Sequence, residues 1–240
     1  MPTAAVVIIG NEILSGKCED ANSPWLARRL RELGVDLLRI ATVPDVVDEI
    51  AEEVRRCAEK ADLVFTTGGV GPTHDDLTMA GIAQALGLPL HRHPELEALV
   101  RAYLGDRITD DALRMADVPL GSELLWDGEV RFPLIRVGTV HIFPGVPGLL
   151  RLKFDAVAHH FAGEPVRSRK VTTTRAEASI AGPLRALQDR FPAVSIGSYP
   201  QFKERPWTVT VTLDSRALDD LKACEAALRE LLGADIVAER

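Results

Sequence analysis

The sequence predicts an α/β protein in which a mostly parallel sheet is covered by helices on both faces, followed by a smaller α+β domain. Two observations predict this. In the first half of the chain, apolar runs rich in β-branched residues alternate with segments of helical periodicity. Toward the C-terminus the order becomes strand, helix, strand, strand, helix, strand. Because a linker-like segment, Gly163-Glu164-Pro165, separates the two patterns, we expect domains over residues 1–165 and 166–240.

Apolar runs and helix start and stop signals define the elements. Ser23-Pro24 is typical of a helix start and Gly34 of a helix end. In the first domain we expect strands over 4–9, 35–43, 62–67, 123–126, 132–137 and 139–143, and helices over 23–33, 50–57, 94–104, 109–116 and 149–161. In the second domain we expect strands over 170–174, 194–199, 207–213 and 234–238, and helices over 179–190 and 217–232.

Composition excludes several classes of protein. The chain has 240 residues, of which 46% are hydrophobic and 26% charged, as is ordinary for a soluble globular protein. Its net charge of −7 argues against a general binder of nucleic acid or of anionic membranes. Cys18, Cys57 and Cys224 form no metal-ligand pattern and are typical of reduced thiols. With no leader pattern and no apolar run of membrane-spanning length, we expect a cytoplasmic protein.

A glycine-rich loop follows the third predicted strand. Gly68, Gly69 and Gly71 allow backbone N–H groups to face an anion, and the helix predicted after them directs its positive end to the same place. Asp75 and Asp76 open that helical pattern, and two carboxylates would repel a phosphate unless a divalent cation lay between them. The loop therefore predicts a site for a phosphorylated ligand and a metal. The alternative is a structural strand-to-helix turn.

Further candidate residues follow other strands. Glu12 comes just after the first strand and is a candidate metal ligand or general base, the alternative being a solvated loop acid. Thr67 and Thr73 supply hydroxyl groups for phosphate or metal. Asp20 and Asn22 precede the first long helix, and we expect at least one of them to cap it. Because ligands of parallel sheets bind at the carboxyl ends of strands, we expect these loops to form one site.

Several common motifs are absent from the sequence. It contains no G-x-S-x-G elbow, no P-loop lysine and no G-x-G-x-x-G fingerprint, which argues against serine hydrolases, P-loop NTPases and dinucleotide dehydrogenases. Aromatic and basic residues alternate in the last domain, as in some single-strand nucleic-acid binders. These residues are Tyr199, Phe202, Lys203, Arg205 and Trp207. Because that domain has no GxxG clamp and little excess of basic residues, we do not expect nucleic acid as a partner.

The segment GGVGPTHDDLT over residues 68–78 resembles the central loop of the molybdopterin-binding-like domain family. That family includes the MoaB/Mog proteins of molybdenum-cofactor synthesis, the N-terminal region of CinA and the N-terminal domain of eukaryotic FAD synthases. Residues 9–16 resemble the family's first-strand loop and residues 20–22 its Asn-containing turn. FPGVP at 143–147 is similar to the turn of CinA and FAD-synthase relatives, and the last domain resembles the KH-type domain of CinA.

The resemblance implies a three-layer α/β/α fold in a homo-oligomer, with the ligand over the glycine loop. It implies that a divalent metal (Mg, Mn, Co or Ni, with K⁺ as a further ion) and the attacking water are handled by Asp75, Asp76 and Glu12. The substrate-binding residues that it implies are Thr67, Gly68, Gly69, Gly71, Thr73, Asn22 and Gly145. The chain departs from the family at Gly148-Leu149, where many relatives have a Ser-Glu pair.

Three functions remain open from the sequence. The leading hypothesis is a metal-dependent pyrophosphatase of nucleotide diphosphates such as ADP-ribose or FAD. The first alternative is a molybdopterin-binding protein or adenylyltransferase of molybdenum-cofactor biosynthesis. The second is a non-catalytic nucleotide-binding module. All three predict a small nucleotide or pterin as the partner.

Overall fold

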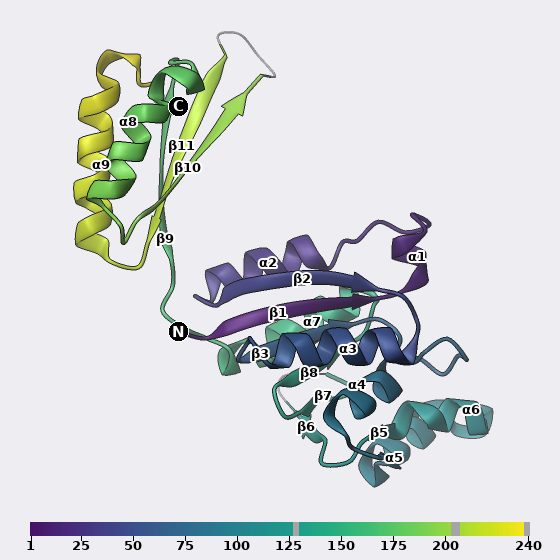
Figure 1. Cartoon of the computed structure of the whole chain (residues 1–240). Helices are drawn as coiled ribbons and strands as arrows, with labels where there is room; N and C mark the ends of the chain where they lie inside the picture. The colour runs from purple at the N-terminus through teal and green to yellow at the C-terminus, as the bar shows by residue number, and fades with distance from the viewer. Residues whose placement is uncertain (127–129, 203–206, 238–240) are drawn as a thin grey trace. The chain divides into compact units, whose positions relative to one another are not determined.

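The computed structural model describes residues 1–126, 130–202 and 207–237. It divides into two compact units, Met1–Gly163 and Glu164–Arg240 (Figure 1). Among the described residues, no helix combines the length and the apolar character needed to cross a membrane. Lys203 and Arg205, the two basic residues considered above for nucleic-acid binding, lie outside the described residues.

A six-stranded sheet in the order β2-β1-β3-β8-β7-β6 forms the centre of the first unit. Four of its strands are parallel, namely β2 (Asp36–Val43), β1 (Thr3–Ile9), β3 (Leu63–Thr67) and β8 (Val140–Phe143). Two antiparallel strands extend one edge, namely β7 (Leu134–Val137) and β6 (Glu123–Leu125). The prediction of a mostly parallel sheet is confirmed, and the parallel strands bring their carboxyl ends to one edge.

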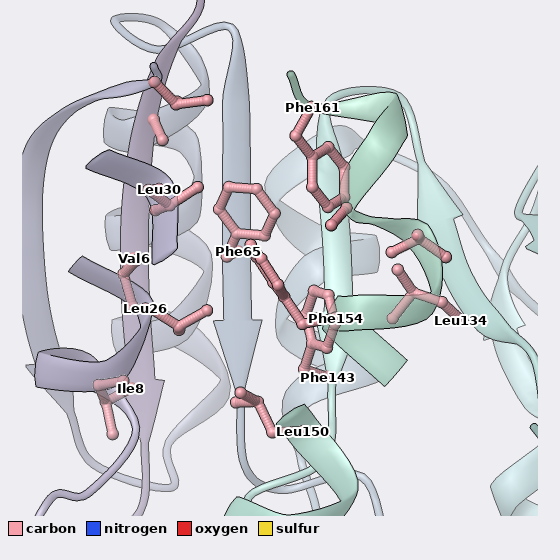
Figure 2. Close-up of a cluster of buried hydrophobic side chains, with 14 residues drawn as sticks. Val6, Ile8, Leu26, Leu30, Phe65, Leu134, Phe143, Leu150, Phe154 and Phe161 are labelled. Carbon is pink, nitrogen blue, oxygen red and sulfur yellow. The ribbon is translucent and has the colours of Figure 1, made fainter. Parts of the chain in front are cut away.

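Helices cover both faces of this sheet, so the fold has the three layers that were predicted. Successive side chains of β1 point to opposite faces. Val6 and Ile8 pack with α2 (Ser23–Glu32) and α7 (Pro147–Val157), as Figure 2 shows for Leu26, Leu30 and Leu150. Val7 and Ile9 pack on the opposite side with α3 (Val47–Ala58) and α4 (Thr78–Leu86).

The face toward α7 is rich in aromatic side chains. Phe65, Phe143, Phe154 and Phe161 lie together in the core, and the ring centroids of Phe65 and Phe161 are 5.0 Å apart (Figure 2). His141 of β8 joins them, with its ring 4.9 Å from Phe161. Nδ1 of His141 forms a hydrogen bond with the Thr139 carbonyl oxygen at 3.1 Å. Burial lowers the pKa of His141 to about 4.

This low pKa predicts acid destabilisation. Below the ordinary histidine pKa of 6.5, the unfolded chain binds a proton at His141 that the folded chain rejects until the pH nears 4. The free energy of unfolding should therefore fall by about 2 kcal/mol between about pH 7.5 and 5.0 through this residue alone. Urea unfolding at both pH values measures the loss. His141→Phe should reduce the difference by that amount, and an unchanged pH dependence would contradict the assignment.

The connections depart from the prediction in three places. The helix expected to open at Asp75 and Asp76 begins at Thr78, so both aspartates lie in the preceding turn. A short helix, α1 (Asn11–Leu14), follows β1. Between α4 and β6, a two-stranded ribbon of β4 (Leu90–Arg92) and β5 (Asp117–Pro119) encloses α5 (Pro94–Leu104), η1 (Gly105–Arg107), α6 (Asp110–Leu113) and η2 (Arg114–Ala116).

The second unit is an antiparallel sheet in the order β10-β11-β9 with two helices. Its elements are β9 (Arg167–Thr173), α8 (Glu177–Arg190), β10 (Ser195–Gln201), β11 (Thr208–Ser215) and α9 (Leu218–Leu232). The closing strand predicted over 234–238 differs. As far as Val237, it consists of η4 (Gly233–Asp235) and one antiparallel bridge from Ile236 to Thr173, because the turn after α9 uses these residues. Residue 238 lies outside the described residues.

Candidate functional site

The loops after β1, β3 and β8 border one cavity of about 680 Å³. This volume is ordinary for a small-molecule site. The predicted site residues that line it are Glu12, Asn22, Thr67, Gly68, Gly69, Gly71, Asp76 and Gly145. Thr73 and Asp75 lie close in the sequence to the lining residues Gly71 and Asp76, but they do not line the cavity. The structure therefore brings together eight of the ten predicted residues, drawn from three separate loops.

The glycine loop has a backbone that other residues would not permit. Gly68 has a φ of +103°, and a Cβ there would lie 2.0 Å from the carbonyl oxygen of Ile9. Gly69 has a φ of +59°, and its Cβ would lie 2.5 Å from Oγ1 of Thr78. The Thr78 hydroxyl donates to the Gly68 carbonyl oxygen at 2.7 Å, which ties the loop to the start of α4. Gly68 therefore allows β3 to end against β1, and Gly69 allows the loop to lie against the start of α4, with no side chain in between.

Asn22 connects the three loops from inside the protein. Its Nδ2 donates to Oγ1 of Thr67 at 3.1 Å and to the Gly145 carbonyl oxygen at 2.8 Å. The Thr67 hydroxyl in turn donates to the Pro144 carbonyl oxygen at 3.0 Å. Among the described residues, Oδ1 of Asn22 is buried and has no hydrogen-bond partner. Thr67 is thus occupied by the protein itself, whereas Asn22 retains an acceptor beside the cavity.

Asp20 caps α2 with its side chain. This agrees with the expectation that at least one of Asp20 and Asn22 caps the helix. Oδ1 of Asp20 accepts from the backbone N–H groups of Asn22 and Ser23, both at 2.9 Å. These N–H groups lie at the start of the helix, where no carbonyl of the same helix can accept from them. The cap leaves the Asn22 side chain free for the loop contacts.

Replacing Asn22 with alanine should destabilise the first unit by about 1–3 kcal/mol, because the buried Thr67 hydroxyl and the Gly145 carbonyl would both lose their donor. Urea unfolding measures the change. Asn11→Ala is the matched control, because Asn11 is exposed and donates to Asp45 through its backbone N–H, which alanine keeps. Equal stability of the two variants would contradict the connecting role of Asn22.

Two acids that line the cavity lie over glycines. A Cβ on Gly10 would lie 2.6 Å from Oε1 of Glu12, and a Cβ on Gly71 would lie 2.7 Å from Oδ2 of Asp76. Each carboxylate therefore occupies space that any other residue at the glycine position would fill. Both acids line the same cavity as the glycine loop. A larger residue at Gly10 would have to displace the flexible end of the Glu12 side chain.

Asp75 and Asp76 converge on Thr73. Oδ2 of Asp76 accepts from the Thr73 backbone N–H at 2.8 Å and also contacts the Thr73 hydroxyl, which lies 2.6 Å from Oδ1 of Asp75. The hydroxyl has one proton and can donate to only one of these carboxylates at a time. Its hydrogen bond lowers the pKa of Asp75, which keeps that carboxyl ionised. The Thr73 hydroxyl therefore contacts the two acids instead of standing free for phosphate.

The carboxylates beside the glycine loop could hold a hard cation whose remaining ligands come from water and the substrate. Within the described residues no three His, Cys, Asp or Glu side chains form a group that could hold a metal by themselves. Mg²⁺ is commonly held by one or two carboxylates together with water and substrate phosphate oxygens. Asp75 and Asp76, which contact the same hydroxyl, are two carboxylates that could hold such a cation, and Asp76 also lines the cavity.

Apolar lining residues were not singled out from the sequence. Ile13, Val146 and Pro147 line the cavity beside the polar residues. Val146 is 58% exposed although it is apolar, which leaves apolar surface at the cavity border. Ile13 belongs to α1, Val146 lies just before α7 and Pro147 begins α7. An isolated apolar residue at such a position carries no chemical signal in a sequence, so only the structure could find these three.

Comparison with known families covers almost the entire chain. Residues 5–163 match the family of the probable molybdopterin binding domain, and residues 165–240 match that of the FAD synthase middle domain. A probable FAD synthase of Caenorhabditis briggsae is 35% identical over 98% of this chain and 50% of that protein. A CinA-like protein of Salinibacter ruber is 34% identical over 98% of this chain and 61% of that protein.

The chain spans about half the length of the probable FAD synthases of Caenorhabditis that it matches. By contrast, a protein of Archaeoglobus fulgidus is 33% identical over 95% of this chain and 96% of its own length. Among solved structures, CinA of Thermoplasma acidophilum, a protein of unknown function, is similar with a TM-score of 0.62 and 31% identity. That match covers 67% of this chain and 98% of the CinA chain.

Proposed function

Because the chain belongs to the family of the probable molybdopterin binding domain, continued by the middle domain of FAD synthase, we propose that it is a metal-dependent pyrophosphatase of nucleotide diphosphates, of the ADP-ribose or FAD class. Its probable FAD synthase relatives support an enzyme that acts on nucleotides. The observation that carries the proposal is the position of Glu12 and Asp76 in one cavity with the glycine loop.

We assign the diphosphate of the substrate to the loop over Gly68–Gly71. Glycines at positive φ leave the backbone open to close approach by phosphate oxygens. The N-terminus of the nine-residue helix α4 follows the loop, and its partial positive charge favours an anion. Asn22 adds the buried acceptor Oδ1, which suits a hydroxyl of the sugar beside the phosphates.

Asp75 and Asp76 would hold the divalent cation, which when bound would neutralise diphosphate charge and lower the pKa of water. Glu12, a carboxylate in the same cavity, is the residue to which we assign general-base catalysis. Water attacks one phosphorus, its proton passes to Glu12, and the bond from that phosphorus to the bridging oxygen breaks. The products are AMP and a second phosphate monoester.

The test is AMP release from ADP-ribose, FAD, NAD and ATP with Mg²⁺, Mn²⁺, Co²⁺ or Ni²⁺, each with and without K⁺. We expect AMP from ADP-ribose or FAD that depends on the metal and is abolished by EDTA. In water enriched in ¹⁸O, one labelled oxygen should enter the phosphates of the products for each bond cleaved. No AMP release with any metal would contradict the proposal.

The family match favours one second candidate, an adenylyltransferase that acts on molybdopterin. It would use the same glycine loop with ATP as the donor of AMP. Incubation with ATP and molybdopterin, followed by analysis for adenylylated pterin, separates it from the pyrophosphatase. Tight nucleotide binding with no turnover in either assay would instead favour a non-catalytic binding module.

A further inference from the structure

A second cavity of about 240 Å³ lies beside the first and shares Val70 and Pro144 with it. Its lining is apolar and aromatic except for one amine. Tyr103 and Phe132 line it with their rings perpendicular at 5.6 Å, and Ile135 and Leu149 contribute aliphatic surface. The shared residues place this cavity directly beside the one that contains the glycine loop.

The amine belongs to Lys153 of α7. Within the described residues, its Nζ donates a hydrogen bond to the Pro133 carbonyl oxygen at 2.6 Å. Burial lowers the pKa of Lys153 to about 8. No carboxylate contributes to that shift, so the protonated amine stands in apolar surroundings with a neutral partner. Such a group is costly to the fold and is typical of ligand-binding sites.

We propose that this cavity receives a planar heteroaromatic ring of the substrate, and that Lys153 donates a hydrogen bond to a carbonyl oxygen of the ring. The inference rests on the proposed function, because it places the diphosphate on the glycine loop. It assigns a flavin dinucleotide as the preferred substrate over ADP-ribose.

The chemistry of the lining carries this preference. An ammonium group only donates, and an isoalloxazine ring offers it two carbonyl oxygens, whereas adenine offers ring nitrogens beside an amino group that itself donates. The terminal ribose of ADP-ribose would bring hydroxyl groups among Tyr103, Phe132 and Ile135, where most of them would lack partners. The flat faces of an isoalloxazine ring instead gain contact with two aromatic side chains.

Two helix substitutions form a matched test. Leu149 and Leu152 are both on α7 and are 51% and 55% exposed, but only Leu149 lines the cavity. Leu149→Trp should fill the cavity and raise KM for FAD about tenfold more than KM for ADP-ribose, whereas Leu152→Trp should leave both unchanged. Lys153→Met should give a similar preferential loss for FAD, because it removes a charged hydrogen-bond donor. Leu149 is half exposed, so its variant does not endanger folding.

Riboflavin, which has the ring and no phosphate, gives a readout that does not require turnover. Quenching of its fluorescence should report binding to the wild-type protein, and Leu149→Trp and Lys153→Met should abolish it. If riboflavin binds in this way but no substrate is hydrolysed, the ring site stands and the pyrophosphatase fails. If FAD and ADP-ribose are hydrolysed alike and neither variant changes their ratio, the ring site is overturned and the pyrophosphatase stands.

Discussion

Replacing Asp76 with asparagine should lower the rate of AMP release roughly 100-fold or more, and replacing Asp75 in the same way should have a smaller effect. A cation on the diphosphate contributes several kcal/mol to the transition state, and about 1.4 kcal/mol corresponds to a factor of ten in rate. Asp76 lines the cavity, whereas Asp75 lies outside its lining. Measuring kcat and KM over a range of metal concentrations tests both variants.

The two asparagine variants control for each other. Asparagine can still accept the Thr73 backbone N–H through its side-chain oxygen, so the turn should persist in Asp76→Asn. The midpoint of thermal unfolding checks this. We also expect Asp76→Asn to need a higher metal concentration for half-maximal rate. Equal rates for wild type and Asp76→Asn at saturating metal would show that Asp76 does not take part in the reaction.

The fold was predictable where local patterns and tertiary structure favour the same element. Continuous apolar runs predicted β1 and β3 correctly, because both faces of these strands are covered by helices. The start of α4 was not predictable in this way. Asp76 accepts the Thr73 backbone N–H, and this local bond competes with helix formation until Thr78. A helical pattern in the sequence does not reveal which side chains occupy the backbone groups before it.

The sequence predicted which loops form the candidate site better than it predicted what each side chain does there. The positions of Glu12 and Thr67 at strand ends made them candidates, and the family resemblance added Asn22. The bonds from Asn22 to Thr67 and Gly145 join residues 45 and 123 positions apart, and no local pattern contains them. Lys153 gave no signal either, because a lysine on a helix is usually solvated. Its apolar surroundings come from α5, β7 and the loop before β7.

Gly68→Ala should destabilise the first unit by at least about 3 kcal/mol, well above the ordinary effect of a single substitution. The new Cβ would lie 2.0 Å from the carbonyl oxygen of Ile9, which is backbone and cannot rotate away. Gly87→Ala is the matched control. Gly87 also has a positive φ, +65°, but a Cβ there meets nothing within 4 Å, so only the left-handed strain of about 1–2 kcal/mol applies.

Urea unfolding of both variants at neutral pH measures the difference, and equal losses would mean that the loop does not approach Ile9 as described. We expect Gly68→Ala to impair nucleotide binding more than it impairs folding. Gly68 lies where β3 ends beside β1, and its N–H donates to the Phe143 carbonyl oxygen of β8 at 3.3 Å. A shift that relieves the clash must therefore move the loop away from one of its neighbouring strands. Nucleotide binding should be lost even under conditions in which Gly68→Ala is still folded, whereas Gly87→Ala should bind normally.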